Sequence, residues 1–325
     1  MNHLKFFKNI SVILIAVVAS LVAMSGHADW PEKSIKIVIG YAPGGGTDIV
    51  ARIIAPKVSE ILKVPVVIEN RPGAAGMIAE GFVAKATPDG YTVLMDPIGI
   101  VMTPSLYKKV PYDAIKDFQP VAQIFAQQFV IVVNPELPVK DLSELVALMR
   151  SKPKEVNIAV AGTSTQLAAE MFRLKLGLTA TLIPYKGSAP ASTSVITGET
   201  QVMFADLPSV KPHLTSGRIK ALAVMGNKPA LGLPNVRPAS ETGVFNGNVS
   251  SWTGVFAPAA TPMSIVNTLN AAINRVLKMP EVAAQLVNVG VEPTPISPEE
   301  FTVFYRNEVA AWRDVVNQAK IPLSD

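Results

Sequence analysis

The chain has 325 residues, a formal net charge of +4, three histidines and no cysteine. This charge is too small, and the lysines and arginines too dispersed, for a nucleic-acid-binding surface. The lack of cysteine excludes thiol catalysis and a lipid anchor on cysteine, and a multi-histidine metal site is excluded because His3 and His27 lie in the N-terminal segment discussed next.

The N-terminal segment has the pattern of an export signal. Lys5 and Lys8 precede an uncharged apolar run from Ile10 to Ala23, which at 14 residues is too short to span a bilayer. Small residues follow, so we predict a signal peptide over residues 1–28, cleaved after Ala28, and a periplasmic protein. An uncleaved anchor is the alternative. About 300 residues remain, which is enough for two domains.

The first predicted strand ends in a run of glycines that opens a helix. Ile35–Ile39 predicts a buried strand, and Gly44-Gly45-Gly46 leads from it into a helix over Asp48–Leu62. Glycine lets a ligand approach the backbone closely, and the first N–H groups of a helix have no partner within it. We therefore predict an anion-binding loop here, with a simple tight turn as the alternative.

Strand and helix then alternate through two successive units, which predicts an α/β fold with mostly parallel sheets flanked by helices. Further strands are expected at residues 64–69, 91–95, 129–133, 157–160, 181–185, 201–204, 220–224 and 252–257. Helices are expected at 77–86 and 142–150, after the turn at 161–166 as far as about Leu176, and after the turn at 186–190 as far as about Thr197. In the C-terminal part, helices are expected to open at Thr261-Pro262 and at Ser297, which has capping-box spacing to Glu300. Residues 226–250 are predicted to form a long connection.

A second turn with hydroxyl groups follows the strand at 157–160. Thr163, Ser164 and Thr165 supply caps or ligand donors at the start of a helix, and Thr163 has capping-box spacing to Gln166. Ligands in open α/β sheets bind beyond the carboxyl ends of the strands. If the two sheets face each other, a cleft between them is lined by both turns.

The glycine turn also imitates a dinucleotide-binding motif. Gly44-x-Gly46 begins that motif and Glu69 stands where a ribose-binding acid would, but Ile49 occupies the third glycine position. A nucleotide-binding α/β enzyme, such as an NAD-dependent oxidoreductase, is therefore one alternative, and an interaction module is another. His213 has no Gly-x-Ser-x-Gly turn to accompany it, so we assign no catalytic residue.

Several short motifs occur in an order and spacing that is typical of one family. They are Trp30-Pro31, Pro43-x-Gly45-x-x-Asp48, the segment 69–76, Ala86-x-Pro88-Asp89-Gly90-Tyr91-Thr92, Pro104-Ser105-Leu106-Tyr107, Pro184-Tyr185-Lys186-Gly187 and Trp252-x-Gly254-x-x-Ala257-Pro258. Over nearly the whole mature chain, the sequence resembles the Bug, or TctC-type, solute-binding receptors of tripartite tricarboxylate transporters.

The resemblance implies a two-lobe type II periplasmic-binding-protein fold. Lobe 1 would comprise residues 29–126 and 249–325, lobe 2 residues 127–226, and a connecting segment residues 227–248, with crossovers near Gln123–Phe129 and Gly226–Ser251. It also implies a monomer without enzymatic activity, cofactor or metal. Such a receptor would bind a small organic anion (a di- or tricarboxylate or an aromatic carboxylate) and pass it to membrane permease subunits.

The resemblance also implies which residues line the cleft. The candidate ligand-binding residues are Tyr41, Pro43, Gly44, Gly45, Gly46, Thr47, Asp48, Ala161, Thr163, Ser164, Thr165, Gln166, Tyr185, Lys186 and Asp206. An unpaired Asp48 would repel a carboxylate, so we expect it to hold the glycine loop in shape, with Arg52 one turn away. Lys186 is either a solvated loop residue or a partner of Asp206.

Three positions differ from the family pattern, and all three are expected to face the cleft. Gln166 stands where a histidine is common, and Ala205-Asp206 stands where Asp followed by Asn is expected. Asp96-Pro97-Ile98-Gly99 replaces a turn richer in serine and threonine.

Overall fold

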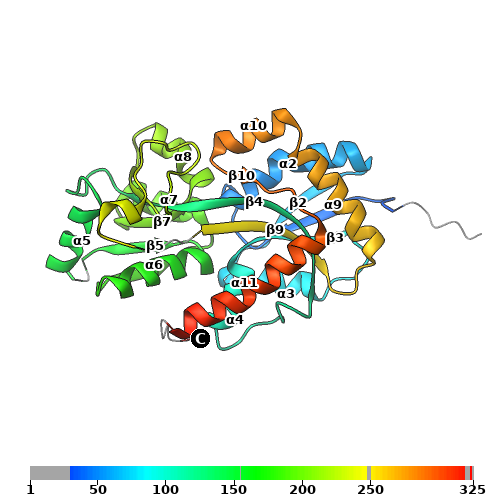
Figure 1. Ribbon diagram of the computed structural model, residues 1–325, viewed down its shortest axis with the longest axis horizontal. Coiled ribbons are helices and arrows are strands. Elements are labelled where there is room, and N and C mark those ends of the chain that lie inside the picture. The colour runs from blue at the N-terminus through cyan, green and yellow to red at the C-terminus, as the bar shows by residue number, and fades with distance from the viewer. Residues whose placement is uncertain (1–29, 154, 247–249, 319–322, 324–325) are drawn as a thin grey trace, which may run out of the picture. The chain divides into compact units, whose positions relative to one another are not determined.

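The computed structural model describes residues 30–153, 155–246, 250–318 and 323, so the predicted signal peptide and its cleavage site lie outside the described residues. Lys33–Asp325 forms one compact unit, distinct from Met1–Glu32. Within it, two groups of strands and helices are joined by two long strands (Figure 1). We call these groups the first and the second lobe. Among the described residues, no helix is both long and apolar enough to cross a membrane.

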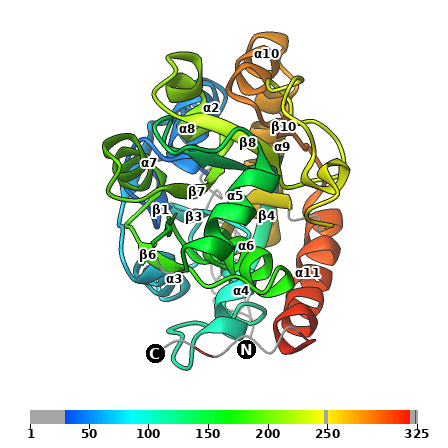
Figure 2. The ribbon, with the colours of Figure 1, turned by 90° about the vertical axis from the view of Figure 1, so that its left-hand side faces the viewer.

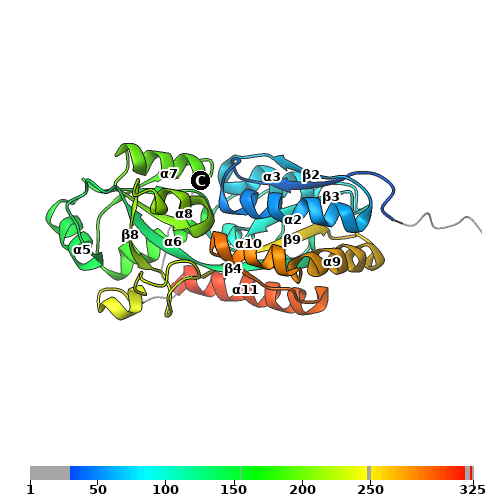
Figure 3. The same ribbon diagram turned by 90° about the horizontal axis from the view of Figure 1, so that it is seen from above.

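The first lobe is built on parallel strands. β1 (Ile35–Ile39) lies between β2 (Val66–Asn70) and β3 (Thr92–Pro97) and pairs with both in parallel. β1 is almost wholly buried, as expected for a strand covered by helices on both faces. Its helices are α2 (Gly46–Leu62), η1 (Ala74–Gly76), α3 (Met77–Ala84), α4 (Gly99–Leu106), α9 (Met263–Leu277), α10 (Pro280–Val289) and α11 (Pro298–Gln318). α2, α9 and α10 cover one face, and α3, α4 and α11 the other (Figures 1 and 3).

The second lobe repeats this plan. Its strands are β5 (Asn157–Val160), β6 (Thr181–Pro184), β7 (Val202–Asp206) and β8 (Lys220–Val224), and β5 pairs in parallel with β6 and β7. Its helices are α5 (Leu142–Ser151), α6 (Thr163–Lys175), α7 (Ser188–Thr197) and α8 (Leu207–Thr215). One apolar core lies beneath α5 and α6 and another beneath α7 and α8, on opposite faces of the strands (Figure 2).

Two long antiparallel strands connect the lobes. β4 (Phe118–Val133) pairs with β9 (Ser250–Pro258) as far as Gln128, and from Phe129 onward it pairs with β7 and β8. The chain therefore crosses between lobes at Gln128–Phe129, within the range expected for the first crossover. The returning connection contains η2 (Ala239–Thr242), and the short β10 (Glu292–Pro293) pairs with β4. The residue boundaries of the lobes stay a prediction.

Helix starts show where local signals hold and where they fail. The predicted capping box at Ser297 is confirmed, because Ser297 and Glu300 exchange backbone-to-side-chain hydrogen bonds. The box predicted for Thr163 is wrong, because Gly162 is the N-cap of α6 and Thr163 already lies in the helix. Pro262, predicted in the first turn of α9, is instead the N-cap.

Candidate ligand-binding cleft

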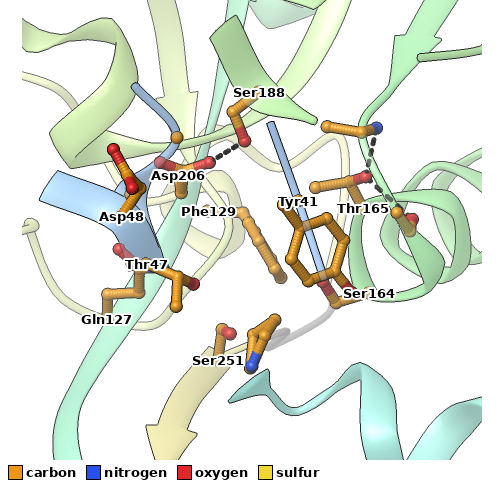
Figure 4. A pocket seen from close by; sticks show the side chains of 15 residues that line it. Tyr41, Thr47, Asp48, Gln127, Phe129, Ser164, Thr165, Ser188, Asp206 and Ser251 are labelled. Atoms are coloured by element: carbon orange, nitrogen blue, oxygen red, sulfur yellow. Dashed lines mark hydrogen bonds between the residues drawn. The ribbon is translucent and has the colours of Figure 1, made fainter. Parts of the chain in front are cut away.

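Three helices begin at one cavity, and each follows a glycine. The N-caps of α2, α6 and α7 are Gly45, Gly162 and Gly187, and no side chain caps any of these helices. A cavity of about 40 Å³ lies at their starts, lined among others by Gly46 and Ser164 (Figure 4). Unpaired N–H groups at the positive ends of three helix dipoles favour an anion at this place.

The strands that join the lobes form another wall of this first cavity. It is made by Gln127 and Phe129 of β4 and Ser251 of β9 (Figure 4). Among the described residues, the buried Gln127 Oε1 and Ser251 Oγ have no hydrogen-bond partner. Buried polar groups are rarely left unpaired, so these two are available to a ligand or to water. The described residues that line the cavity include no lysine, arginine or histidine.

Asp48 shapes the glycine loop as predicted. Its carboxylate accepts hydrogen bonds from the Gly44 amide at 2.9 Å and Asn70 Nδ2 at 3.0 Å, and it forms an ion pair with Arg52 at 2.9 Å. Burial raises the pKa of Asp48, but the hydrogen bonds from Arg52, Gly44 and Asn70 outweigh it and hold the pKa below its ordinary value. Asp48 is therefore a paired carboxylate that fixes the loop.

Asp206 is differently placed. It ends β7 and is the N-cap of α8, accepting from the Ser209 amide at 3.2 Å, while its other oxygen accepts a short hydrogen bond from the Ser188 hydroxyl. The carboxylate also lies against Gly46 at the start of α2. Among the described residues no ion pair joins Asp206 to Lys186, whose side chain is exposed, so the predicted pairing is not formed.

Tyr41 lines both the first cavity and a second one of about 300 Å³, as do Ala161 and Gly162. The Tyr41 hydroxyl donates to the Ala75 carbonyl at 3.2 Å. Its ring lies so close to Gly162 that a Cβ there would come within 2.7 Å of Cε1. Gln166, Tyr107 and the segment 184–186 help to line the second cavity.

Direct hydrogen bonds hold the lobes together around these cavities. The Ala42 amide donates to the Lys186 carbonyl at 2.9 Å. Thr103 Oγ1 and Thr163 Oγ1 are 2.9 Å apart, and Tyr107 Oη donates to Gln166 Oε1 at 3.2 Å. The structure is therefore a closed arrangement.

A pair of acidic residues is buried inside the first lobe. Glu80 of α3 and Asp96 of β3 are both fully buried, and none of their four carboxyl oxygens has a hydrogen-bond partner among the described residues. Burial raises the pKa of Glu80 to about 7, and burial together with the charge of Glu80 raises that of Asp96. The pair therefore retains a proton where exposed acids have lost theirs. The turn from Asp96 to Gly99 was expected to face the cleft. This is wrong for Asp96, which is fully buried in the first lobe, whereas Pro97 of the same turn lines the first cavity.

The candidate residues from the sequence divide between the two cavities. Those lining the first are Tyr41, Gly45, Gly46, Thr47, Asp48, Ala161, Ser164, Thr165 and Asp206. Those lining the second are Tyr41, Ala161, Gln166, Tyr185 and Lys186. Pro43, Gly44 and Thr163 line neither. Sequence reasoning missed Gln127, Ser188 and Ser251, although Ser188 had the same signal as Thr163, a hydroxyl residue after a glycine that opens a helix.

Comparison with known proteins identifies the family. The sequence model of the tripartite tricarboxylate transporter family receptor matches residues 50–321. The protein belongs to this family. It is 32% identical to protein BugT of Bordetella pertussis over 317 residues, covering 94% of this chain and 97% of BugT.

Solved structures of similar proteins agree with this tripartite tricarboxylate receptor family. A structure of an R. palustris protein with adipate is 34% identical to this chain, with a TM-score of 0.87. The match covers 91% of this chain and 100% of the chain in that structure. MatC from Rhodopseudomonas palustris with bound malate is 32% identical, with a TM-score of 0.84, covering 88% of this chain and 100% of MatC. These matches confirm the predicted periplasmic-binding-protein fold.

Membership decides between the alternatives left open by the sequence. The family is one of periplasmic solute-binding receptors and not of enzymes, so the nucleotide-binding enzyme is not supported. A solute-binding role and a periplasmic location follow from the family.

Proposed function

We propose that the protein captures a small organic carboxylate between its lobes and delivers it to the permease subunits of a tripartite tricarboxylate transporter. One observation carries the proposal: three uncapped helix starts, from both lobes, meet at one cavity. Neutral N–H and O–H donors would bind the carboxylate, because no cationic side chain is among the described residues that line the cavity.

The relatives support this ligand class. Similar structures contain adipate in one case and malate in another, and both are dicarboxylates. The family's role as a transporter receptor supports the permease as partner. A cleavable signal over residues 1–28 would export the chain, and a monomer suffices because both sides of the cavity come from one chain.

Ligand binding would act through the equilibrium between open and closed forms. The first lobe supplies the α2 start, and the second supplies the α6 and α7 starts. A ligand that contacts both lobes has higher affinity for the closed form and shifts the population toward it. The permease would then recognise the closed form.

Calorimetric titration and thermal unfolding with malate, adipate, citrate and benzoate test the proposal, with NAD as a comparison. We expect at least one carboxylate to bind and to raise the melting temperature by several degrees, and NAD to have no effect. Ser164→Ala should weaken binding about fivefold to tenfold by removing a hydroxyl from the cavity. Ser151→Ala, at the exposed end of α5, is the matched control and should bind like the unmodified protein. Stabilisation by NAD alone, or by none of these compounds, contradicts the proposal.

A further inference from the structure

Asp206 places a negative charge inside a cavity that otherwise favours anions. Its side chain is buried, with 7% of the residue exposed, and it lines the first cavity beside Ser188 (Figure 4). Its partners are the Ser188 hydroxyl and the Ser209 amide, both neutral donors. Among the described residues it has no cationic partner, unlike Asp48, whose charge is balanced by Arg52.

The capacity of this carboxylate is only partly used. An ionised carboxyl group has about four acceptor positions. Two donors reach Asp206 from the protein, one to each oxygen. Because Asp206 lines the cavity, its remaining acceptor positions can take hydrogen bonds from donor groups of a bound ligand.

Charge balance decides what such a ligand carries. Each helix start contributes about half a positive charge, so three of them contribute about 1.5. Asp206 carries one negative charge, of which the start of α8 that it caps balances about half, so about one positive charge remains for a ligand. This is about half of what a ligand with two carboxylates and no cationic group would need. A ligand with a hydrogen-bond donor of its own can place that donor against the Asp206 carboxylate. The carboxylate of the ligand then remains free to bind the N–H groups at the helix starts.

We propose that Asp206 is a specificity-determining residue that selects carboxylates bearing an ammonium or hydroxyl group over plain carboxylates. This inference rests on the proposed function, because it assumes that a carboxylate occupies the cavity. The ammonium is favoured over the hydroxyl, since only the ammonium neutralises the charge of Asp206.

A purely structural role as the N-cap of α8 does not account for this placement. Asp141 has that role at α5, where it accepts from the Glu144 amide at 2.9 Å, and it does so on an exposed surface. A cap needs only a side-chain oxygen, which Asn supplies as well as Asp. Asp206 instead presents a carboxyl group in the wall of a buried cavity, next to a predicted anion site.

The test uses calorimetry at pH 7 with ligands matched in length. The sets are succinate, malate and aspartate; glutarate and glutamate; and adipate and 2-aminoadipate. We expect the amino or hydroxy member of the set that binds to be at least about tenfold tighter than its plain counterpart. Asp206→Asn should reduce this ratio to near one while keeping the cap of α8, and Asp141→Asn should leave it unchanged.

The outcomes separate the inference from the proposed function. Equal affinity for the plain and the donor-bearing acids overturns the inference. A preference that persists in Asp206→Asn also overturns it. Neither result contradicts carboxylate binding as the proposed function. If none of the acids binds, the proposed function fails and the inference fails with it. A preference for ammonium identifies charge as the basis of selection, and an equal preference for hydroxyl identifies hydrogen bonding. Melting temperatures of both variants show whether they are folded.

Discussion

A methyl group added to Gly46 would lie 2.4 Å from Oδ1 of Asp206, which is closer than any real contact of a Cβ atom. The two residues belong to different lobes, since Gly46 begins α2 and Asp206 ends β7. The absence of a side chain at Gly46 is therefore what lets the lobes close to this distance. The neighbouring Gly45 is less restricted, because a Cβ there would lie 3.6 Å from the Ala42 carbonyl and 3.8 Å from the Ser188 amide.

Gly46→Ala should impair closure without impairing folding. Alanine is a better helix former than glycine, so α2 is not weakened locally, and the clash arises only when Asp206 approaches. In the presence of a carboxylate that the unmodified protein binds, we expect the variant to have a larger radius of gyration by small-angle X-ray scattering than the unmodified protein.

Gly45→Ala provides the matched control for this prediction. Its backbone has φ of −76°, which alanine adopts freely, and its new methyl group makes only ordinary contacts. Its scattering should match that of the unmodified protein. Identical radii for both variants and the unmodified protein would show that Gly46 does not limit closure.

Two hydroxyl groups join the lobes in an asymmetric way. Thr103 Oγ1 donates to the Gly99 carbonyl at 2.9 Å, so Thr163 is the donor in the bond between the two threonines. Both residues are fully buried. Thr103→Val leaves the Thr163 hydroxyl without an acceptor in the closed form and should disfavour closure by about 1–3 kcal/mol. Thr163→Val costs less, because Thr103 keeps its bond to Gly99.

The double variant with both substitutions completes this prediction. Replacing both partners by an apolar group of the same shape is often nearly neutral. The double variant should therefore close more readily than Thr103→Val alone, as measured by scattering and by melting temperature. Strictly additive effects would show that the hydroxyl pair contributes no coupling between the lobes.

The sequence predicted those parts of the cleft that depend on local signals. The β1 strand, the glycines before α2 and the pairing of Asp48 with Arg52 all follow from residues close together in the chain. β4 was predicted only from residue 129 because Gln123 and Gln127 interrupt its apolar pattern. Those residues lie in a strand because tertiary pairing with β9 overrides local propensity.

Contacts between distant residues could not be predicted in the same way. Glu80 and Asp96 belong to a helix and a strand, and nothing in either local pattern indicates that both carboxyl groups are buried together. The α4 helix was missed because six of its eight residues are buried, which leaves no amphipathic period to recognise, and because Pro104 inside it is a helix-breaking signal. The approach of Asp206 to Gly46 likewise depends on how the two lobes close.

Asp48 should stabilise the folded state above the acidic range. Its pKa is held below the ordinary value, so the folded state favours the ionised form; this stability is present at neutral pH and is lost as the pH falls through the folded-state pKa. Asp48→Asn should lower the free energy of unfolding at pH 7 by about 1–2 kcal/mol, an effect reduced by the exposure of Arg52.

The control for Asp48→Asn lies on the same helix. Glu60 pairs with Lys57 on the exposed side of α2, and surface pairs of this kind contribute little. Denaturant unfolding of Glu60→Gln should match the unmodified protein at both pH 7 and pH 3. The deficit of Asp48→Asn should shrink at pH 3, and a constant deficit at both values would contradict the assigned cause.

The Glu80–Asp96 pair should give the opposite pH dependence. Burial raises the pKa of Glu80 to about 7, so between its ordinary value of 4.5 and about 7 the folded state binds more protons than the unfolded state. The free energy of unfolding contributed by Glu80 therefore falls as the pH rises through this window. A rise of one in pKa corresponds to about 1.4 kcal/mol, so the decrease is expected to be about 3 kcal/mol.

Glu80→Gln removes the contribution of Glu80 to this dependence, because the amide has nearly the same shape and does not ionise, whereas Asp96 keeps a contribution of its own because its burial raises its pKa. The hydroxyls of Tyr41, Tyr107, Tyr112 and Tyr305 share this environment. Their own burial, and after it the nearby acidic charges, raise their pKa values, so they stay neutral across the window. In denaturant unfolding, the variant should equal the unmodified protein at pH 5 and exceed it at pH 8. Glu136→Gln, on an exposed turn, should track the unmodified protein throughout. A Glu80→Gln variant that is no more stable than the unmodified protein at pH 8 would show that the pair ionises without cost.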